Sequence, residues 1–408
     1  MVPKGWQKYA VGELCASIVP GRNKPKVFDG DIPWVTTPEI NGRYIPSNLQ
    51  VNYVSTTALS DAGGKIVPKG AVVMAAVGEL GLIAITSEPV VLNQQLHAFV
   101  CSKLVNNEFL AYWLTTQKPY MESIASKTTI PYMNKTNCES IPVLLPPLAE
   151  QFKIAQILIA WDKAIVVTEK LLTNSQQQKK ALTQQLLTGK KRLLDEDGVR
   201  FSGEWVHGQL GDLCAFKGGF AFKEVYQGQS MGELPFIKVS DMNLLGNERN
   251  IEYSNNWVSF ETAKLMKAKP FPESSIVFAK VGAALLLNRR RILLRPTIID
   301  NNMMAAVPSN AADTEFLYQL LMAIDFARFV QEGAVPSINQ GDLSSFKLSY
   351  PYVEEQPKIA AVLSAADAEI STLEKKLACL KDEKKALMQQ LLTGKRRVKV
   401  DAEEAVSA

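Results

Sequence analysis

The chain repeats part of its own sequence, and this repeat restricts its fold more than any other feature. Residues 179–193 recur as residues 384–398, with twelve of fifteen positions identical. A looser match continues through the segments before them, where Trp6 aligns with Trp205 and Gly12 with Gly211. Because a sequence repeat predicts a structural repeat, we expect a globular domain followed by a long helix, twice over.

The two kinds of segment are copied to different degrees. The C-terminal ends of the helical segments, 179–193 and 384–398, are nearly copied, whereas the globular segments keep only a framework, such as Gly30–Val35 aligned with Gly232–Ile237. A constant segment present twice favours one kind of partner bound twice. A variable segment present twice favours two related surfaces with different targets.

The sequence predicts an α+β fold in which two mixed α/β domains are separated by two long antiparallel coiled-coil helices, with a pseudo-twofold internal repeat. Alternating or β-branched runs bounded by Gly, Pro or Asn predict strands, and amphipathic runs predict helices. The predicted strands are Ile32–Thr37, Leu234–Val239, Ala71–Val77, Ser275–Val281, His97–Val100 and Met304–Val307, and the predicted domain helices are Asn107–Leu114 and Thr314–Met322. The predicted boundaries are 1–147 for domain 1, 148–192 for the first long helix, 193–203 for a linker, 204–350 for domain 2, 351–397 for the second long helix and 398–408 for a disordered tail.

Both long helices carry apolar residues at alternating spacings of four and three, the heptad seam of a left-handed coiled coil. Thr168, Ser175 and Lys179 interrupt the first seam. Gly189 and Gly394 are expected just past the helix ends, where a left-handed backbone favours glycine. The predicted seam residues are Ile154, Leu158, Trp161, Ile165, Leu172, Leu182, Leu186, Ile359, Leu363, Ile370, Leu373, Leu377, Leu380, Leu387 and Leu391.

The length of the helices suggests what they do. About 33 residues separate the first and last seam positions, so each helix is about 50 Å long at ~1.5 Å per residue. An antiparallel pair then carries one domain at either end. The alternative is that the heptads form only a dimerisation stalk, but their alternation with two variable domains argues against it.

The sequence lacks the motifs of several enzyme classes. It has no G-x-x-x-x-G-K-[ST] phosphate loop, no Asn/Asp-Pro-Pro-aromatic motif of the kind amino-methyltransferases carry, and no His/Cys spacing of a metal site. His97 and His207 are its two histidines, and Met304 at the position matching His97 favours a packing role for that side chain. The glycines of Gly78–Gly81 are too weak a motif for a nucleotide site. We therefore expect no catalytic residue, cofactor or metal in this chain.

Charge and hydropathy narrow the function classes further. The net charge of +4 is compatible with nucleic-acid binding without indicating it. The sequence has no run of 18 or more apolar residues, so it predicts no membrane span. The N-terminus lacks the apolar core of a signal peptide. The five cysteines are scattered, which fits a reducing cytoplasm.

These features resemble the specificity subunits of type I restriction–modification systems. The first long helix opens with Pro-Pro-Leu-Ala-Glu-Gln at 146–151 and ends with Leu-Leu-Thr-Gly-Lys at 186–190, an element repeated at 391–395, and these are similar to the family's conserved helical regions. Pro3–Trp6 and the Ile-Pro-Trp-Val and Leu-Pro-Phe-Ile runs look like its target recognition domains. The resemblance covers essentially the whole chain. The second helix departs from it with Pro-Tyr-Val-Glu-Glu-Gln at 351–356 and with Pro357 in the first turn, where proline is tolerated.

The resemblance implies a function. The chain would bind double-stranded DNA, reading one half of a bipartite site with each domain, and its helices would dock two methyltransferase subunits. Those partners would modify adenine with S-adenosylmethionine, and two restriction subunits could add cleavage that needs ATP and Mg. Helices of about 50 Å could hold two reading surfaces one DNA turn (~34–36 Å) apart or slightly more, so the unread gap should follow helix length.

The residues that contact DNA are predicted from side-chain chemistry. Arg and Lys suit phosphates and guanines, whereas Asn and Gln suit adenines. A solvated loop is the alternative for the arginine run, and structural turns are the alternative for the paired amides. The predicted DNA-contacting residues are Arg22, Asn23, Lys24, Lys26, Asn93, Gln94, Gln95, Lys127, Thr128, Lys217, Lys238, Lys280, Asn288, Arg289, Arg290, Arg291, Asn301 and Asn302.

Three other functions stay open at this point. A DNA-recognition subunit of another phage-defence system would use the same fold with different enzymes. A coiled-coil scaffold with two protein-binding domains would have no affinity for DNA. A standalone nuclease or methyltransferase with unfamiliar motifs would be active without partners.

Overall fold

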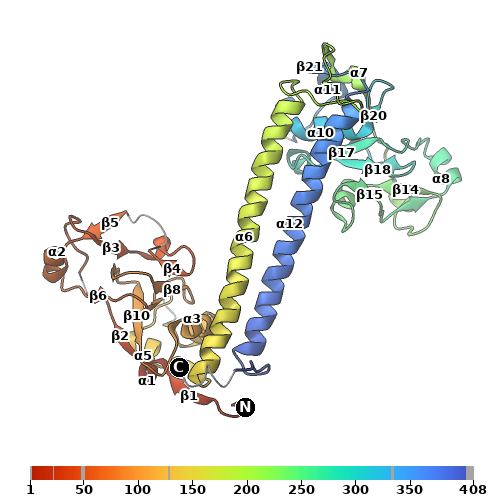
Figure 1. Cartoon of the computed structure of the whole chain (residues 1–408). Helices are drawn as coiled ribbons and strands as arrows, with labels where there is room; N and C mark the ends of the chain where they lie inside the picture. The colour runs from red at the N-terminus through yellow and green to blue at the C-terminus, as the bar shows by residue number, and fades with distance from the viewer. Residues whose placement is uncertain (1, 22, 47–50, 127–128, 332–334, 401–408) are drawn as a thin grey trace. The chain divides into compact units, whose positions relative to one another are not determined.

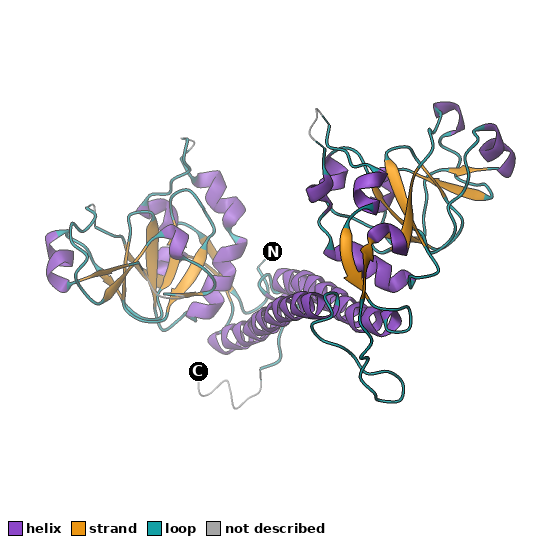
Figure 2. Ribbon diagram, turned by 90° about the horizontal axis from the view of Figure 1, so that it is seen from above, coloured by secondary structure: helices purple, strands orange, loops and turns teal. Residues whose placement is uncertain are grey.

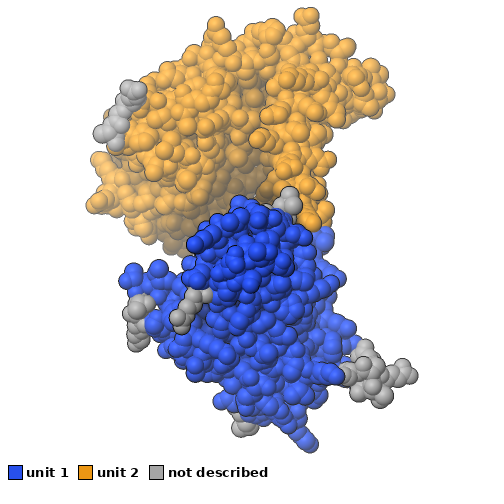
Figure 3. Space-filling view, turned by 90° about the vertical axis from the view of Figure 1, so that its left-hand side faces the viewer, with its two compact units in different colours: residues 1–169, 376–408 blue, residues 170–375 orange. Residues whose placement is uncertain are grey.

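The computed structural model describes residues 2–21, 23–46, 51–126, 129–331 and 335–400. The chain forms two compact units, each built from segments far apart in the sequence. Unit 1 contains residues 1–169 and 376–408, and unit 2 contains residues 170–375 (Figure 3). Each unit therefore holds one domain together with the beginning of one long helix and the end of the other.

Domain 1, in unit 1, is a mixed α/β domain whose described residues form three sheets. Their strand orders are β2-β10-β7-β8-β4, β5-β3-β9-β6 and β1-β11. Short helices flank the strands (Figure 2). The elements are β1 (Gln7–Ala10), α1 (Val11–Leu14), β2 (Cys15–Ile18), β3 (Ile32–Val35), η1 (Thr37–Glu39), β4 (Tyr44–Ile45), β5 (Asn52–Val54), α2 (Thr56–Asp61), β6 (Ile66–Val67), β7 (Val72–Ala75), β8 (Ile83–Thr86), β9 (Val90–Leu92), β10 (Leu96–Cys101), α3 (Asn107–Thr116), α4 (Lys118–Ile124), α5 (Lys135–Glu139) and β11 (Pro142–Leu145).

Domain 2, in unit 2, repeats this topology, except that a single bridge between Phe271 and Thr297 takes the place of the pairing of β6 with β9. Its sheets have the orders β13-β20-β17-β18-β15, β16-β14-β19 and β12-β21. The predicted repeat of domain and helix is therefore also a repeat of strand order. The elements are β12 (Val206–Gln209), α7 (Leu210–Leu213), β13 (Cys214–Gly218), η2 (Glu224–Tyr226), β14 (Leu234–Ile237), η3 (Val239–Asn243), β15 (Asn250–Ile251), β16 (Trp257–Val258), α8 (Phe260–Leu265), β17 (Ile276–Ala279), α9 (Ala283–Leu286), β18 (Arg291–Leu293), β19 (Ile298–Ile299), β20 (Met303–Pro308), α10 (Thr314–Ala323), η4 (Phe326–Phe329), α11 (Gln340–Ser344) and β21 (Lys347–Tyr350).

Four predicted strands end two residues earlier than expected: β7 ends at Ala75 and β17 at Ala279, and the other two, β3 and β14, end early for one shared reason. The sequence predicts strand to Thr37 and Val239, but β3 ends at Val35 and β14 at Ile237. A 3₁₀ turn begins after each, because an acidic side chain accepts a hydrogen bond from the backbone N–H before the turn. Glu39 accepts from the N–H of Thr36 at 2.8 Å, and Asp241 accepts from the N–H of Lys238 at 2.7 Å.

The long helices are α6 (Leu148–Leu186) and α12 (Gln356–Leu391), which pack side by side in each unit (Figures 1 and 2). Ion pairs give their direction. In unit 1, Asp162 and Glu169 of α6 pair with Lys384 and Lys381 of α12, at 2.5 and 2.7 Å. Partner numbers fall as α6 numbers rise, so the helices are antiparallel, as predicted. In unit 2, Lys179 of α6 likewise pairs with Asp367.

The seam positions of the two helices lie between them or against the domains. Each of the fifteen predicted seam residues is buried or half-buried. Two of the residues that interrupt the first seam, Thr168 and Ser175, are also buried. Thr168 Oγ1 donates to the carbonyl of Ala164 at 2.8 Å, and Ser175 Oγ donates to Glu369 at 3.1 Å. Short hydroxyl side chains can thus occupy the seam because they satisfy their own polar groups.

Both helices end before their predicted limits of 192 and 397. The regular hydrogen bonding stops at Leu186 and Leu391, and a turn then leads to Gly189 and Gly394. These glycines have φ of +70° and +69°, the left-handed conformation that the sequence predicted for them.

A buried glutamine joins each domain to its helix. Gln151 accepts from the N–H of Asn106 at 2.8 Å and donates to the carbonyls of Leu104 and Pro146 at 3.0 and 2.9 Å. Gln356 makes the matching bonds in unit 2, at 2.8, 2.8 and 3.0 Å. Because one side chain satisfies three backbone groups, the domain cannot leave its helix without breaking all three bonds.

A buried glutamate holds the end of the other helix in each unit. In unit 1, Arg397 donates to both oxygens of Glu150 at 2.7 and 2.8 Å, and Trp6 Nε1 donates to Glu150 at 3.1 Å. In unit 2, Arg192 donates to both oxygens of Glu355 at 2.8 and 2.6 Å. Trp205 Nε1 completes this second clamp at 3.3 Å. The repeated basic ends of the helices are therefore structural parts of the two units.

No helix within the described ranges is long and apolar enough to span a membrane.

Candidate nucleic-acid interface

In domain 1 the ends of several strands meet at one place. β3 and β9 run parallel, so their carboxyl ends coincide, and the N–H of Asn93 donates to the carbonyl of Val35 at 2.9 Å. The turn between β9 and β10 is also bonded to the end of β7, because the N–H of Ala76 donates to the carbonyl of Gln95 at 2.8 Å. β2 and β7 both run antiparallel to β10, so β2 ends at the same side. We call this place surface 1 and define it by Ile18, Thr36, Ala76 and residues 93–95.

Domain 2 builds the same arrangement with the same backbone bonds. The N–H of Asp300 donates to the carbonyl of Ile237 at 3.0 Å, and the N–H of Lys280 donates to the carbonyl of Asn302 at 2.9 Å. β13 and β17 run antiparallel to β20 and end on this side. We call this place surface 2 and define it by Lys217, Lys238, Lys280 and residues 300–302.

Surface 1 presents amides to the solvent. Gln94 and Gln95 are exposed and Asn93 is half-buried. The oxygen of Gln95 accepts from Thr37 Oγ1 at 3.0 Å and from Asn93 Nδ2 at 3.3 Å. These bonds occupy the oxygen of the Gln95 amide and fix its orientation, so the amide nitrogen is the group that can donate to a ligand.

Surface 2 presents lysines and amides. Lys217, Asn301 and Asn302 are exposed, while Lys280 and Lys238 are half-buried. Lys238 Nζ donates to Gln227 Oε1 at 2.9 Å. The predictions made on Asn93, Gln94, Gln95, Lys217, Lys238, Lys280, Asn301 and Asn302 thus fall on two equivalent surfaces.

Asp300 is the acidic member of surface 2. It is 8% exposed, and burial raises the pKa of its carboxyl group above the ordinary value of 3.8. The N–H of Asn302 donates to it at 2.8 Å, which opposes that shift. Beside it, a Cβ at Gly219 would lie 2.0 Å from the Asp300 carbonyl oxygen, so only glycine fits there. The turn of surface 2 is therefore tightly constrained.

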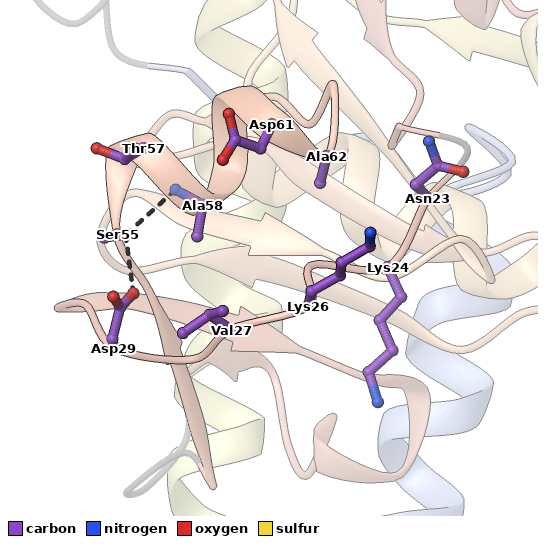
Figure 4. Close-up of a pocket in the computed structure, with 10 residues that line it drawn as sticks. All are labelled: Asn23, Lys24, Lys26, Val27, Asp29, Ser55, Thr57, Ala58, Asp61 and Ala62. Carbon is purple, nitrogen blue, oxygen red and sulfur yellow. Dashed lines mark hydrogen bonds between the residues drawn. The ribbon is translucent and has the colours of Figure 1, made fainter.

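A second group of predicted residues lies elsewhere in domain 1. Asn23, Lys24 and Lys26 are exposed and line a cavity of about 440 Å³ beside α2 (Figure 4). Because Val54 pairs with Ile32 at the start of β3, α2 lies near the end of that strand remote from surface 1. Figure 4 shows Ser55 bonded to Asp29 on one side of this cavity, at 2.9 Å, with both lysines on the other.

The arginine run of domain 2 differs from its prediction. Arg290 is 1% exposed, donates to the carbonyls of Asn288 and Ile324 at 2.5 and 2.8 Å, and stacks on Phe326, 3.8 Å from the ring centroid. Burial lowers its pKa from 12.5 to about 10. In this packing the guanidinium cannot reach a phosphate, because the side chain is buried and its two terminal nitrogens donate to carbonyls inside the domain.

The neighbours of Arg290 divide between core and surface. Arg291 is 9% exposed and donates to the carbonyls of Arg290 and Met242, at 2.8 and 3.1 Å, so it too is engaged inside the domain. Asn288 is half-buried and donates to Asp325 at 2.6 Å. Arg289 is exposed and bonds to Asn243. DNA contact stays a prediction for Arg289, whereas the packing contradicts it for the two buried arginines.

Three predicted residues, Arg22, Lys127 and Thr128, lie outside the described residues. Reasoning from single residues also missed part of surface 1. Ile18, Thr36 and Ala76 carry no charge and gave no signal alone. The signal that could have found them is the strand register, which shows that they occupy the positions equivalent to the lysines of the other repeat.

Comparison with known families matches both halves of the repeat. The family described as "Type I restriction modification DNA specificity domain" matches residues 3–174 and 202–381. The MjaIX specificity subunit of a type I restriction enzyme from Methanocaldococcus jannaschii is 25% identical over 430 residues, covering 97% of this chain and 95% of that protein. The EcoR124I/EcoR124II specificity subunit from Escherichia coli is 23% identical and covers 64% of this chain and 63% of that protein.

Solved structures agree on the fold. The S subunit of a type I restriction–modification system from M. genitalium has a TM-score of 0.60 with this chain at 16% identity, and 96% of each chain is covered. A second structure, described as a type I R-M system whose assembly and conformational transition were analysed, has a TM-score of 0.54 at 17% identity.

Proposed function

We infer that this chain, because it belongs to the type I restriction–modification DNA specificity family, reads a bipartite DNA site, with surface 1 reading one half and surface 2 the other. One observation carries the proposal. The same strand ends and backbone bonds build both surfaces, while the side chains they present differ. This is expected of one backbone scaffold that recognises two different DNA sequences.

The exposed groups suit base edges. Asn and Gln can pair with the N6 and N7 of adenine, and Lys with the O6 and N7 of guanine. Both surfaces lie on turns held by a sheet, so the donors are positioned before DNA arrives and little ordering entropy is lost on binding. Lysines such as Lys24 and Lys26, away from surface 1, suit phosphates, which position a protein without specifying sequence.

The long helices are proposed to bind partners and to set the unread gap. α6 presents exposed apolar side chains at Phe152, Val166 and Val167 in unit 1, which suit a protein partner rather than DNA. We assign this face to the methyltransferase subunits, of which the repeat predicts two. Adenine methylation with S-adenosylmethionine, and any cleavage that needs ATP and Mg, are assigned to partner chains, and none to this one.

Selection of bound sequences tests the reading role. The chain is purified with its methyltransferase and incubated with a random duplex library, and bound DNA is sequenced. We expect one bipartite motif with a fixed gap. Gln94→Ala should relax one half only and Asn301→Ala the other only. The matched control is Lys69→Ala, an exposed residue before β7, at the end remote from surface 1.

Other outcomes separate the alternatives. A sequence-specific complex that forms without any methyltransferase would favour a recognition subunit of a different defence system. A chain that selects no sequence and has no affinity for DNA would favour a protein scaffold. Either result contradicts the assignment of the two surfaces to a type I site.

Heptad insertion tests the spacer. Seven residues added to each long helix keep the seam in register and lengthen each helix by about 10.5 Å. We expect the same two half-sites with about three more unread base pairs, since base pairs rise ~3.4 Å each. An unchanged gap would show that the helices do not set it.

A further inference from the structure

Surfaces 1 and 2 differ systematically at three equivalent positions. Domain 1 has Ile18, Thr36 and Ala76, and domain 2 has lysine at each: Lys217, Lys238 and Lys280. Every one of the three substitutions adds a positive charge to the same surface. Differences scattered by chance over the domains would not gather there.

The strand register establishes that the positions are equivalent. Leu96 and Met303 are equivalent, because their N–H groups donate to the carbonyls of Asn93 and Asp300, at 3.2 and 3.0 Å. Two residues further along, Ala98 lies opposite Ile18 and Ala305 lies opposite Lys217. Ile18 and Lys217 therefore occupy the same place in the sheet.

The other two pairs are fixed by backbone bonds. Ala76 and Lys280 each donate an N–H to the last residue of the equivalent turn, at 2.8 and 2.9 Å, and each accepts from the segment before α5 or α11. Thr36 and Lys238 each follow the strand residue that accepts from that turn, and each is capped by an acidic side chain. The lysines therefore replace neutral residues without any change in the local backbone.

The lysines are held near the turn of surface 2. Lys280 Nζ lies 3.1 Å from the position a Cβ would take at Gly218, so it extends over the end of β13. Lys238 interacts electrostatically with Asp300, at the start of the turn. Surface 1 has the neutral Asn93 at that place. Surface 2 is thus a cluster of three cations with one partly desolvated carboxylate, and surface 1 at the same positions is neutral.

We propose that the two half-sites differ in base composition: surface 2 reads guanines through its lysines, whereas surface 1 reads adenines through the amide of Gln94. This inference rests on the proposed function. Guanine offers two acceptors, O6 and N7, in the major groove, and a cation is their natural partner. Adenine offers one donor and one acceptor, which an amide matches and an ammonium group does not.

Substitution to the residue of the other repeat tests the inference. The variants are Lys217→Ile, Lys238→Thr and Lys280→Ala, singly and together, in the complex with the methyltransferase. Each residue introduced already occupies the same backbone in domain 1, and a thermal scan verifies folding. Lys280→Arg is the control that keeps the charge. The readout is the bound-sequence selection, repeated at several salt concentrations.

We expect each contacted guanine to lose its preference by about 5- to 150-fold, the usual value of a good base contact. The loss should fall in one half-site only, the half that Asn301→Ala affects, and Lys280→Arg should retain the guanine. The half-site that Gln94→Ala affects should stay unchanged in the lysine variants.

Three results would overturn the inference. Equal weakening of all sequences, with a smaller salt dependence and an unchanged motif, would make the lysines phosphate contacts. A wild-type motif without guanine in the half read by surface 2 would exclude guanine reading. A lysine variant that alters both halves would show an indirect effect. In each case a bipartite wild-type motif would still support the proposed function, and its absence would contradict that function itself.

Discussion

Removal of Arg397 should destabilise unit 1 through the buried carboxylate of Glu150. Side-chain exposure is 4% for Glu150 and 44% for Arg397. The perturbation is Arg397→Leu, which leaves Glu150 with Trp6 as its remaining side-chain donor. The neighbouring Arg396→Leu is the matched control, because Arg396 is also exposed and makes no bond to Glu150 in this structure.

The magnitude follows from the exposure of the two partners. Breaking a buried ion pair on one side costs about 3–5 kcal/mol, because the remaining charge is left uncompensated. Arg397 is nearly half exposed, so water can replace part of its interaction with Glu150, and we reduce the cost to about 2–3 kcal/mol. For a unit of this size the midpoint of thermal unfolding should fall by about 5–10 °C.

The assay is calorimetric unfolding of the wild type, of the single variants Arg397→Leu, Arg396→Leu and Glu150→Gln, and of the double variant Glu150→Gln with Arg397→Leu. Neutralising Glu150 removes the uncompensated charge, so the double variant should be less destabilised than the sum of its two single variants, by about 1–3 kcal/mol. Equal shifts for Arg397→Leu and Arg396→Leu, or strict additivity, would refute the argument.

Three further predictions follow from buried groups. Burial lowers the pKa of His97 from 6.5 to about 4, so in acid the unfolded chain gains the proton first. Stability of unit 1 should therefore fall as pH drops from about 6.5 to about 4, by up to about 3 kcal/mol. His97→Met, which introduces the residue found at Met304, should remove this loss when unfolding is measured as a function of pH. The same fall in stability below pH 6.5 in the variant and the wild type would contradict the prediction. Gln151→Leu should destabilise unit 1 by about 2–3 kcal/mol in urea, because three backbone groups lose their partner, one of them buried and two partly buried. A change below about 1 kcal/mol would contradict this reasoning. Iodoacetamide at pH 8 should alkylate the exposed Cys379 first, while Cys214, whose pKa burial raises to about 12, should react only on unfolding. Equal labelling rates by mass spectrometry would show that domain 2 opens readily.

The architecture was predictable because its signals are local. A heptad seam is read from residues three and four apart, and the repeat is read by comparing the chain with itself. Neither depends on knowing the tertiary fold. The helix ends were misplaced by about six residues at both predicted limits, because the basic turn after each helix continues the sequence pattern although the hydrogen bonding has stopped at Leu186 and Leu391.

The candidate site was predictable only in part. Side-chain chemistry singled out the amides and lysines of surfaces 1 and 2, but it also singled out Arg290, whose burial depends on Phe326 and on the carbonyl of Ile324. These partners lie more than thirty residues away in sequence, so no local pattern reveals them. The neutral counterparts of the lysines were missed because their meaning lies in strand register, which the sequence did not provide.

The measurement that tests the central claim most directly is a map of modified adenines in cells that express this chain with its methyltransferase. Single-molecule sequencing of the host DNA detects each modified base. The account predicts one bipartite motif with two specified halves and a gap of constant length, lost when the gene for this chain is deleted. Methylation that persists without this chain, or a continuous motif without a gap, would contradict two reading surfaces on one chain.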